Sequence, residues 1–530
     1  MHDDPKQAGR ANAQTPSLLP SLSLPKGGGT IRGMGEKFGA NPVNGTGSMS
    51  VPLPTSPGRA GFGPALSLSY DSGAGNGPFG FGWSLALASI TRKTDKGLPR
   101  YLDAEESDVF VLSGAEDLVP MVTAEGTRRA DARCVDGCEY LVYRYRPRIE
   151  GPFARIERWV RRSDGDTHWR SISRENVATL YGRTAESRIV NPAEPAQVFC
   201  WLICESYDDK GNAVVYGYKA ENSDGVDTSQ AHERNRTDRC RSAARYLKRI
   251  RYGNRVSRLV QQDLSCAEWL FEVVFDYGEH DVSHPTPNDD GVWHCRHDPF
   301  SQYRSGFEVR TYRLCQRMLM FHHFPDEAGV GRDCLVRSTD IAYRDIRDNP
   351  DDRARGHPVA SFIAAITQCG YRRREAGDYL RRTYPPVEFE YSQVEIDGTV
   401  RELDAKSQEN LPIGDGGAYQ WVDLDGEGAS GILTEQAGTW FYKPNLGNGE
   451  FGAVKTVARI PSRVTLSGGR THLLDLAGDG QLDLVEFGGT APGFYERTDD
   501  EDWEAFKPFE SLPNIPWDEP NLRFLDLNGD

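Results

Sequence analysis

The chain has 530 residues, with 62 Lys+Arg against 78 Asp+Glu, so its formal charge is −16 at pH 7. At roughly 150 residues per domain, this length predicts about three or four domains. Hydrophobic residues make up 38% and charged residues 26%, which excludes a largely disordered chain. The acidic total argues against general binding of nucleic acid.

The N-terminal residues 1–21 are predicted to be a disordered leader, because they contain Pro, Ser and Gly but no aromatic residue. Their only apolar stretch is short and interrupted by proline, so no Sec signal peptide is recognisable. Elsewhere Arg, Asp or Gly interrupts every apolar run before it reaches the roughly 18 residues of a membrane helix. We therefore expect no membrane insertion by this chain.

Residues 22–384 are predicted to form a β domain. Short runs that alternate or are rich in β-branched and aromatic residues recur along this region, at residues 48–53, 65–70, 109–112, 140–145, 213–218 and 271–275. Turn sequences such as Asp164-Gly165-Asp166 and Lys210-Gly211-Asn212 separate them. Because long helical periodicity is absent, the fold class expected is mainly β.

Residues 385–530 contain an internal repeat. Related motifs occur at 421–428, 473–480 and 524–530, with first aspartates 52 and 51 residues apart. A period near 50 residues is typical of a β-propeller blade, so this region is predicted to be the start of a propeller. The third copy stops within its motif at Asp530, which predicts a fragment of a longer reading frame. This region holds 10 Lys+Arg and 28 Asp+Glu, a net charge of −18.

The repeated motif is a candidate calcium loop. Carboxylates at alternating positions of a tight turn can converge on one point, and their oxygens suit Ca²⁺. The candidate ligands are Asp423, Asp425 and Glu427 in the first loop, Asp475, Asp479 and Asp483 in the second, and Asp526, Asn528 and Asp530 in the third. Because Glu427 replaces an aspartate and Ala477 stands where an oxygen is wanted, metal-free turns remain the alternative.

Several other patterns have a functional and a structural interpretation. The run Gly75 to Gly80 matches G-x-G-x-x-G, but Pro78 and the aromatic residues that follow favour a glycine-rich loop over a dinucleotide site. Glu388-Phe389-Glu390 has the E-x-E form of ADP-ribosyltransferases and equally fits strand alternation. No catalytic constellation is recognised, so no enzymatic activity is expected.

Histidines and cysteines offer a further candidate metal site. The residues that could be assembled into it are His294, Cys295, His297, His322 and His323. Their spacing is irregular, and the C-x3-C pairs at 134/138 and 200/204 lack the spacing of a zinc module. Buried or incidental side chains are the alternative for both sets.

Several segments together resemble one family. The runs 25–38, 61–73 and 79–83 resemble the N-terminal domain of the Salmonella virulence plasmid B protein (SpvB) family. The runs 246–254, 275–280 and 298–324 are similar to the B component of bacterial insecticidal toxin complexes. The C-terminal motifs look like FG-GAP/VCBS repeats, as in integrin-like propellers. The resemblance covers residues 22–530, without the Rhs/YD array of that family; Tyr207 to Asn212 alone resembles one such unit.

The resemblance implies a non-enzymatic B component of a secreted toxin complex. Such a component forms a shell with a C component around a cytotoxic polypeptide, and its propeller docks on and gates the channel-forming A component. Two alternatives remain open. The first is the N-terminal carrier region of an SpvB-type ADP-ribosyltransferase, and the second is a Ca²⁺-dependent propeller adhesin.

Overall fold

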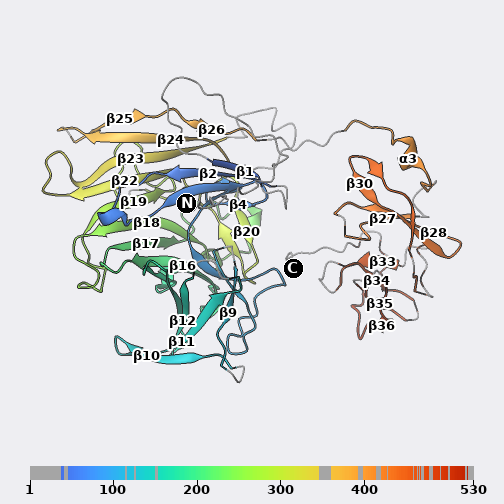
Figure 1. Cartoon of the computed structure of the whole chain (residues 1–530). Coiled ribbons are helices and arrows are strands. Elements are labelled where there is room, and N and C mark those ends of the chain that lie inside the picture. The colour runs from blue at the N-terminus through green and yellow to red at the C-terminus, as the bar shows by residue number, and fades with distance from the viewer. Residues whose placement is uncertain are drawn as a thin grey trace, which may run out of the picture.

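The computed structural model describes residues 37–40, 46–113, 116–123, 127–149, 153–289, 291–344, 360–375, 377–391, 398–412, 419–426, 428–457, 459–461, 464, 466, 471–476, 481–489, 491–498, 502–517, 519 and 522. The predicted leader 1–21 lies outside them. No helix in these ranges is long and apolar enough to span a membrane. Strands dominate (Figure 1), which confirms the prediction of a mainly β protein.

Eight antiparallel strands close into a ring. In circuit order they are β7 (Ser89–Arg92), β8 (Phe110–Leu112), β9 (Glu116–Pro120), β11 (Cys138–Pro147), β12 (Arg155–Arg161), β13 (Thr167–Ile172), β14 (Ala178–Tyr181) and β16 (Val198–Tyr207). Two long-range pairings close the circuit: Thr91 lies opposite Cys200, and Val119 lies opposite Arg146. Closure pairs both edges of every strand in the ring.

The ring interior is filled by side chains. Along β13 buried and half-buried positions alternate, with Trp169 fully buried inside while His168 and Arg170 point to the outer face. Phe110 packs edge-on against Trp169, with ring centroids 5.0 Å apart. The remaining buried interior residues are Ile90, Leu118, Tyr145, Ile156, Tyr181, Val198, Trp201 and Ile203. The ring is therefore a packed core rather than a channel.

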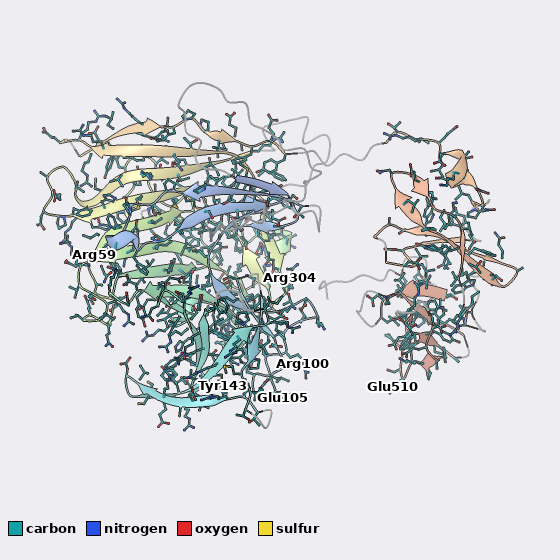
Figure 2. All side chains as sticks on the ribbon, in the orientation of Figure 1. Arg59, Arg100, Glu105, Tyr143, Arg304 and Glu510 are labelled. Carbon is teal, nitrogen blue, oxygen red and sulfur yellow. The ribbon has the colours of Figure 1, made fainter. Side chains whose placement is uncertain are left out.

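The connection from β7 to β8 covers one end of the ring. Arg92 is buried, and its Nη1 donates hydrogen bonds to Asp103 at 2.7 Å and to Asp108 at 2.6 Å. Arg128 donates to the Asp103 carbonyl and lies over the ring of Tyr143. Figure 2 labels two further residues of this connection, Arg100 and Glu105. Buried arginine–aspartate pairs thus fix the segment to the ring.

The sheet continues beyond the ring through β16, whose residues 205–207 pair with β17. Its further strands are β17 (Ala213–Ala220), β18 (Arg245–Asn254), β19 (Trp269–Asp276), β22 (Arg317–Phe324), β23 (Gly331–Arg344), β24 (Phe362–Arg373), β25 (Tyr379–Thr383) and β26 (Val387–Glu388). A smaller sheet of β1 (Lys37–Ala40), β2 (Gly47–Leu53), β3 (Leu66–Asp71) and β6 (Trp83–Leu85) packs on it. Tyr252, Val273 and Leu68 are fully buried between the two layers.

The glycine-rich run 75–80 is a short hairpin that docks the small sheet. Strands β4 (Asn76–Gly77) and β5 (Gly80–Phe81) pair, and the Asn76 amide donates to Asp298 at 2.9 Å. Gly80 has φ +88, and an added Cβ would meet the Ser361 carbonyl oxygen at 2.5 Å. The glycine therefore permits a close backbone approach, and the structural interpretation of this run is confirmed.

The first part of the chain extends past the predicted boundary at residue 384. Strand β26 pairs with β24, and the Trp83 indole donates to the Tyr391 hydroxyl at 2.8 Å. Phe389 packs against Trp83 with ring centroids 5.0 Å apart, while Glu388 and Glu390 are exposed. The E-x-E run is therefore an alternating strand end with both carboxylates on the solvent side.

Short elements complete this part. They are β10 (Ala130–Val135) beside β11, β15 (Arg188–Val190) beside β16, the hairpin of β20 (Phe300–Gln302) and β21 (Val309–Thr311), the 3-10 turns η1 (Arg59–Gly61), η2 (Ala185–Ser187) and η3 (Ala231–Glu233), and the helix α1 (Asp238–Arg241). The Thr237 hydroxyl accepts from the Cys240 N–H and caps α1.

The C-terminal part builds two four-stranded antiparallel sheets. The first contains β27 (Tyr419–Val422), β28 (Gly431–Gln436), β29 (Thr439–Lys443) and β32 (Lys455–Thr456), and the second β33 (Thr471–Leu474), β34 (Asp483–Glu486), β35 (Gly493–Tyr495) and β36 (Lys507–Pro508). Helix α3 (Ala405–Gln408) and the hairpin β30 (Asn445–Gly447)–β31 (Glu450–Phe451) accompany them. Their core, which includes Leu433, Trp440 and Leu484, is separate from the others. Closure into a propeller stays a prediction.

Candidate functional site

A cavity of about 710 Å³ beside η3 is the first candidate site. Three segments line it: residues 225–236 around η3, the loop 295–299, and the end of β21 with Tyr312. His232 and His297 are exposed at the cavity, and Cys295 is half-buried. The cavity thus brings together titratable residues that are far apart in the sequence.

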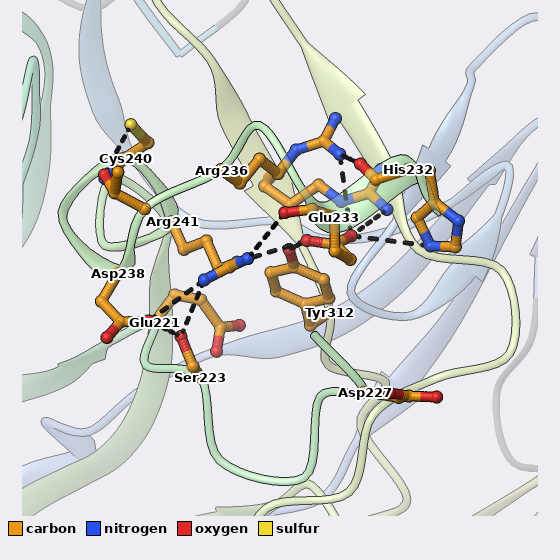
Figure 3. A network of polar contacts seen from close by, with 12 residues as sticks. Glu221, Ser223, Asp227, His232, Glu233, Arg236, Asp238, Cys240, Arg241 and Tyr312 are labelled. Atoms are coloured by element: carbon orange, nitrogen blue, oxygen red, sulfur yellow. Dashed lines mark hydrogen bonds and ion pairs between the residues drawn. The ribbon is translucent and has the colours of Figure 1, made fainter. Parts of the chain in front are cut away.

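Glu233 forms the centre of a polar network beside this cavity (Figure 3). Its carboxylate is buried and accepts hydrogen bonds from the Tyr312 hydroxyl at 2.5 Å, Arg310 Nη2 at 3.0 Å and Arg241 Nε at 3.2 Å. Arg236 lies 3.7 Å from Glu233 and also binds Glu308, to which its Nε donates at 2.8 Å. Buried carboxylates require such partners, because an unpaired charge in the interior is costly.

The electrostatics of this network favour a fixed ion cluster. Burial by itself would raise the pKa of the Glu233 carboxyl, but the hydrogen bonds from Tyr312 and Arg241 and the charge of Arg310 lower it below its ordinary value. Burial, followed by the hydrogen bond to Glu233, raises the pKa of Tyr312 to about 12. Glu233 stays ionised and Tyr312 stays protonated near neutral pH. The network can therefore fix the η3 segment.

A second buried cluster contains Asp276, Glu279 and His280. It is the one group of three candidate metal ligands found among the described residues. The Lys248 ammonium already donates to Glu279, to His280 Nε2 at 2.7 Å and to the Phe275 carbonyl at 2.8 Å. Lys248 therefore compensates Glu279, and Arg317 compensates Asp276, so the cluster does not fit a metal ion as it stands.

The predicted histidine–cysteine site does not assemble. His322 Nε2 lies 2.7 Å from the Ser56 hydroxyl, and His323 lies between Glu272 and Asp333. Cys295 and His297 line the 710 Å³ cavity. Within the described ranges no metal-ligand group contains any of these residues. The structure therefore does not bring these residues together as one ligand group.

The predicted calcium loops are described only in part. Glu427, Asp479, Asp526, Asn528 and Asp530 lie outside the described residues. In the first loop, Asp423 Oδ2 accepts from the Gly428 N–H at 2.7 Å. In the second loop, the buried Asp483 accepts from the N–H groups of Leu476 and Arg497, while Asp475 follows β33. Calcium binding stays a prediction.

Arg497 is a site residue that sequence reasoning missed. It is buried at the end of the second sheet, and its Nη2 donates to Asp425 of the first loop at 3.0 Å. A guanidinium from one repeat thus neutralises a candidate calcium ligand of the repeat before it. The signal available in the sequence was the aromatic pair Phe494-Tyr495 two residues before it, which repeats Phe441-Tyr442 at a spacing of 53 residues. The Glu233 network had no such signal, because its members have no regular spacing.

Residues 41–324 match the model of the family described as "Salmonella virulence plasmid 65kDa B protein". The chain belongs to this family. The mono(ADP-ribosyl)transferase SpvB of Salmonella choleraesuis (strain SC-B67) is 38% identical over 384 residues, which are 70% of the chain and 60% of that protein. The chain thus spans 60% of the length of this curated relative.

Solved structures place the same fold in two kinds of toxin. The N-terminal domain of the effector protein SpvB from Salmonella typhimurium strain LT2 matches with TM-score 0.54 and 38% identity, over 61% of the chain and 98% of that domain. The Photorhabdus luminescens Tc holotoxin pore matches with TM-score 0.71 and 31% identity, over 95% of the chain and 23% of that structure's chain. The structural neighbours of this chain therefore include components of toxin complexes.

The expectation that the chain functions as a non-enzymatic toxin-complex B component is wrong. The A and C components stay predicted partners, since the similar solved structures are components of toxin complexes. The curated relatives are SpvB mono(ADP-ribosyl)transferases at 37–38% identity, and the SpvB N-terminal domain matches almost throughout. The motifs that suggested the B component include Tyr252 and Phe275, which are fully buried. Buried motif residues specify a shared core rather than a partner.

Proposed function

We propose that this chain is the non-catalytic N-terminal region of an SpvB-type mono(ADP-ribosyl)transferase toxin, acting as the carrier of a catalytic part outside residues 1–530. The observation that supports it is the match to 98% of the SpvB N-terminal domain at 38% identity. The name of the curated relatives supplies the activity of the whole toxin. In this proposal the carrier acts outside the producing cell, as the word effector implies for the relative.

The described side chains support a scaffold role. The charged groups at the most buried sites, such as Glu233, Lys248 and Arg92, are held in ion pairs and hydrogen bonds. The E-x-E residues Glu388 and Glu390 lie exposed beside a strand end and do not line the 710 Å³ cavity. Charged side chains that pair with one another stabilise the fold, whereas catalysis needs groups that face a substrate.

A transfer assay tests the proposal. The purified 530-residue chain is incubated with biotinylated NAD and a host-cell lysate, beside a full-length SpvB relative as positive control. We expect labelling by the relative and none by the chain. If the chain labels a protein and the Glu388→Gln/Glu390→Gln variant does not, the carrier assignment is wrong. The E-x-E run would then be a catalytic site.

The domain division is part of the same proposal, with the predicted boundary at 384 moved to 391: a leader at 1–21, the SpvB-like β region from 22 to 391, and the start of a propeller from there to 530. The two four-stranded sheets near the C-terminus support the third unit. Limited proteolysis tests the division. We expect the first stable cuts between residues 391 and 405, and cuts within 100–380 that precede them would contradict it.

A further inference from the structure

A second and larger cavity lies on the outer face of the eight-stranded ring. Its volume is about 870 Å³, and it crosses the strands from β11 to β14, reaches β16 and continues over β17, β18 and β19. We call it the outer-face groove; the lining residues that carry the argument are Tyr140, Trp159, His168, Arg183, Tyr216 and Arg258. This volume lies within the range of sites that bind a ligand of several hundred daltons.

Aromatic side chains form one end of the outer-face groove. Trp159 and His168 are direct neighbours across β12 and β13, and their rings stack with centroids 5.8 Å apart. Tyr140 on β11 completes the group, 5.6 Å from Trp159 and 5.7 Å from His168. Each of the three points outward because its strand neighbours, such as Trp169, fill the ring interior.

Arginines give the groove its charge. Arg258 donates to Glu205 at 2.7 Å and lies over the ring of Tyr207, and Arg251 pairs with Glu272. Arg183 is exposed at the groove, and its side chain has no ion pair or hydrogen bond within the described ranges. One uncompensated guanidinium therefore remains available to an acidic group.

Two polar groups in the groove have no protein partner for a hydrogen bond. In the part of the chain that the structure describes, neither the His168 imidazole nor the Tyr216 hydroxyl has one, and both side chains are half-buried where they line the groove. Polar groups that line a groove without a protein partner can bind either water or a ligand. Burial, followed by the charges of Arg183 and Arg188, lowers the pKa of His168 to about 3, so the imidazole is neutral and can both donate and accept.

We propose that the outer-face groove binds an extended polypeptide segment that carries acidic and aromatic side chains. Tyr, Trp and Arg are the residue types enriched at the centres of protein interfaces. The unpaired Arg183 guanidinium can bind a carboxylate of the segment. Nucleic acid fits less well, because Asp136, Glu205 and Asp263 also line the groove and phosphate binding needs an excess of cations. The inference goes beyond the proposed function and does not depend on it.

A peptide selection tests this site. Phage-displayed random peptides are selected on the immobilised full chain. We expect enrichment of Asp and Glu with Phe, Trp or Tyr. The leading peptide, labelled with fluorescein, is then titrated by anisotropy. We expect Arg183→Glu to weaken its binding about tenfold or more and Tyr216→Phe, which removes only a hydroxyl, about threefold.

The matched control is Arg174→Glu, which makes the same charge change at an exposed arginine of the ring outside the groove and should leave binding unchanged. Circular dichroism of each variant shows whether it is folded. Failure to enrich any binding peptide overturns the proposal, as does equal binding to the chain and the folded Arg183→Glu variant. Heparin or oligothymidylate that displaces the peptide at equal concentration would replace it with general polyanion binding, which also overturns it.

Discussion

At the scale of single residues, stability depends on buried charges that neutralise one another. Glu233 holds Arg241 and Arg310, and Lys248 holds Glu279. Removing one partner of a buried pair leaves the other charge uncompensated, which costs more than the pair contributes. These residues therefore make sharp tests of the structure.

Glu233→Gln should destabilise the chain by about 3–5 kcal/mol, because two buried guanidinium groups lose their counter-charge. Urea unfolding at pH 7 measures the loss, and Glu175→Gln, an exposed glutamate, is the control. The pKa of Glu233 is lowered in the folded state. Its contribution is therefore present above the unfolded pKa of roughly 4.3 and is lost as the pH falls through the folded value. A loss no larger than that of the control would contradict the network.

The lowered pKa of His168 predicts a different pH dependence of the free energy of unfolding. Its folded pKa of about 3 lies below the unfolded value of roughly 6.5, so the unfolded chain binds the extra proton first as the pH falls. The contribution of His168 to the free energy of unfolding is fully present above pH ~6.5. Between pH 7 and pH 5 the free energy of unfolding should fall by about 2 kcal/mol because of this group. In His168→Gln that part of the loss should vanish. Parallel urea curves for both proteins at the two pH values check this, and equal losses would refute it.

At the scale of elements, the closed ring is the organising unit. An isolated pair of strands is marginally stable in water, so packing of Trp169, Trp201 and Phe110 inside the ring must hold the strands together. The Thr91–Cys200 and Val119–Arg146 pairings join strands that are far apart in the chain. Such non-local pairings predict slow folding.

Trp169→Ala should destabilise the ring by about 3–5 kcal/mol, because it leaves a large cavity among aromatic neighbours. Trp421→Ala is the matched control, since Trp421 is 58% exposed and surface changes usually cost about 0.5 kcal/mol or less. Hydrogen exchange of β12, β13 and β14 locates the effect. Equal destabilisation by the two substitutions would show that the ring interior is not the core described here.

At the scale of the whole molecule, the two parts differ in core and in charge. The cores of the first part and of the C-terminal sheets share no residue. Residues 385–530 carry a net charge of −18, so the first 384 carry +2. Repulsion between like charges is therefore concentrated in the C-terminal part. Arg497 and Lys455 lie close to Asp425 and offset some of it.

Calorimetry of the full chain should show two transitions rather than one, because separate cores unfold as separate cooperative units. Raising the salt concentration should stabilise the C-terminal transition more, since it screens the excess acidic charge. Arg497→Met should lower that transition alone. A single transition that moves as a whole with salt and with Arg497→Met would contradict two independent units.

The amino-acid sequence by itself determined the local structure. The runs 48–53, 140–145, 213–218 and 271–275 became β2, β11, β17 and β19 with ends shifted by a few residues at most, because alternation and β-branched composition act locally. The sequence also located the turn at Lys210-Gly211-Asn212, where the Asp208 carboxylate accepts from backbone N–H groups. Its motifs identified the family.

Only the tertiary structure decided which residues meet. The closed ring, the Glu233 network, the Arg497–Asp425 bond and the outer-face groove all join positions far apart in the chain, and no local pattern encodes such contacts. The same limit explains the wrong assignment to a toxin-complex B component. Motif residues such as Tyr252 are selected for packing in a shared core, and packing alone does not say what a scaffold carries.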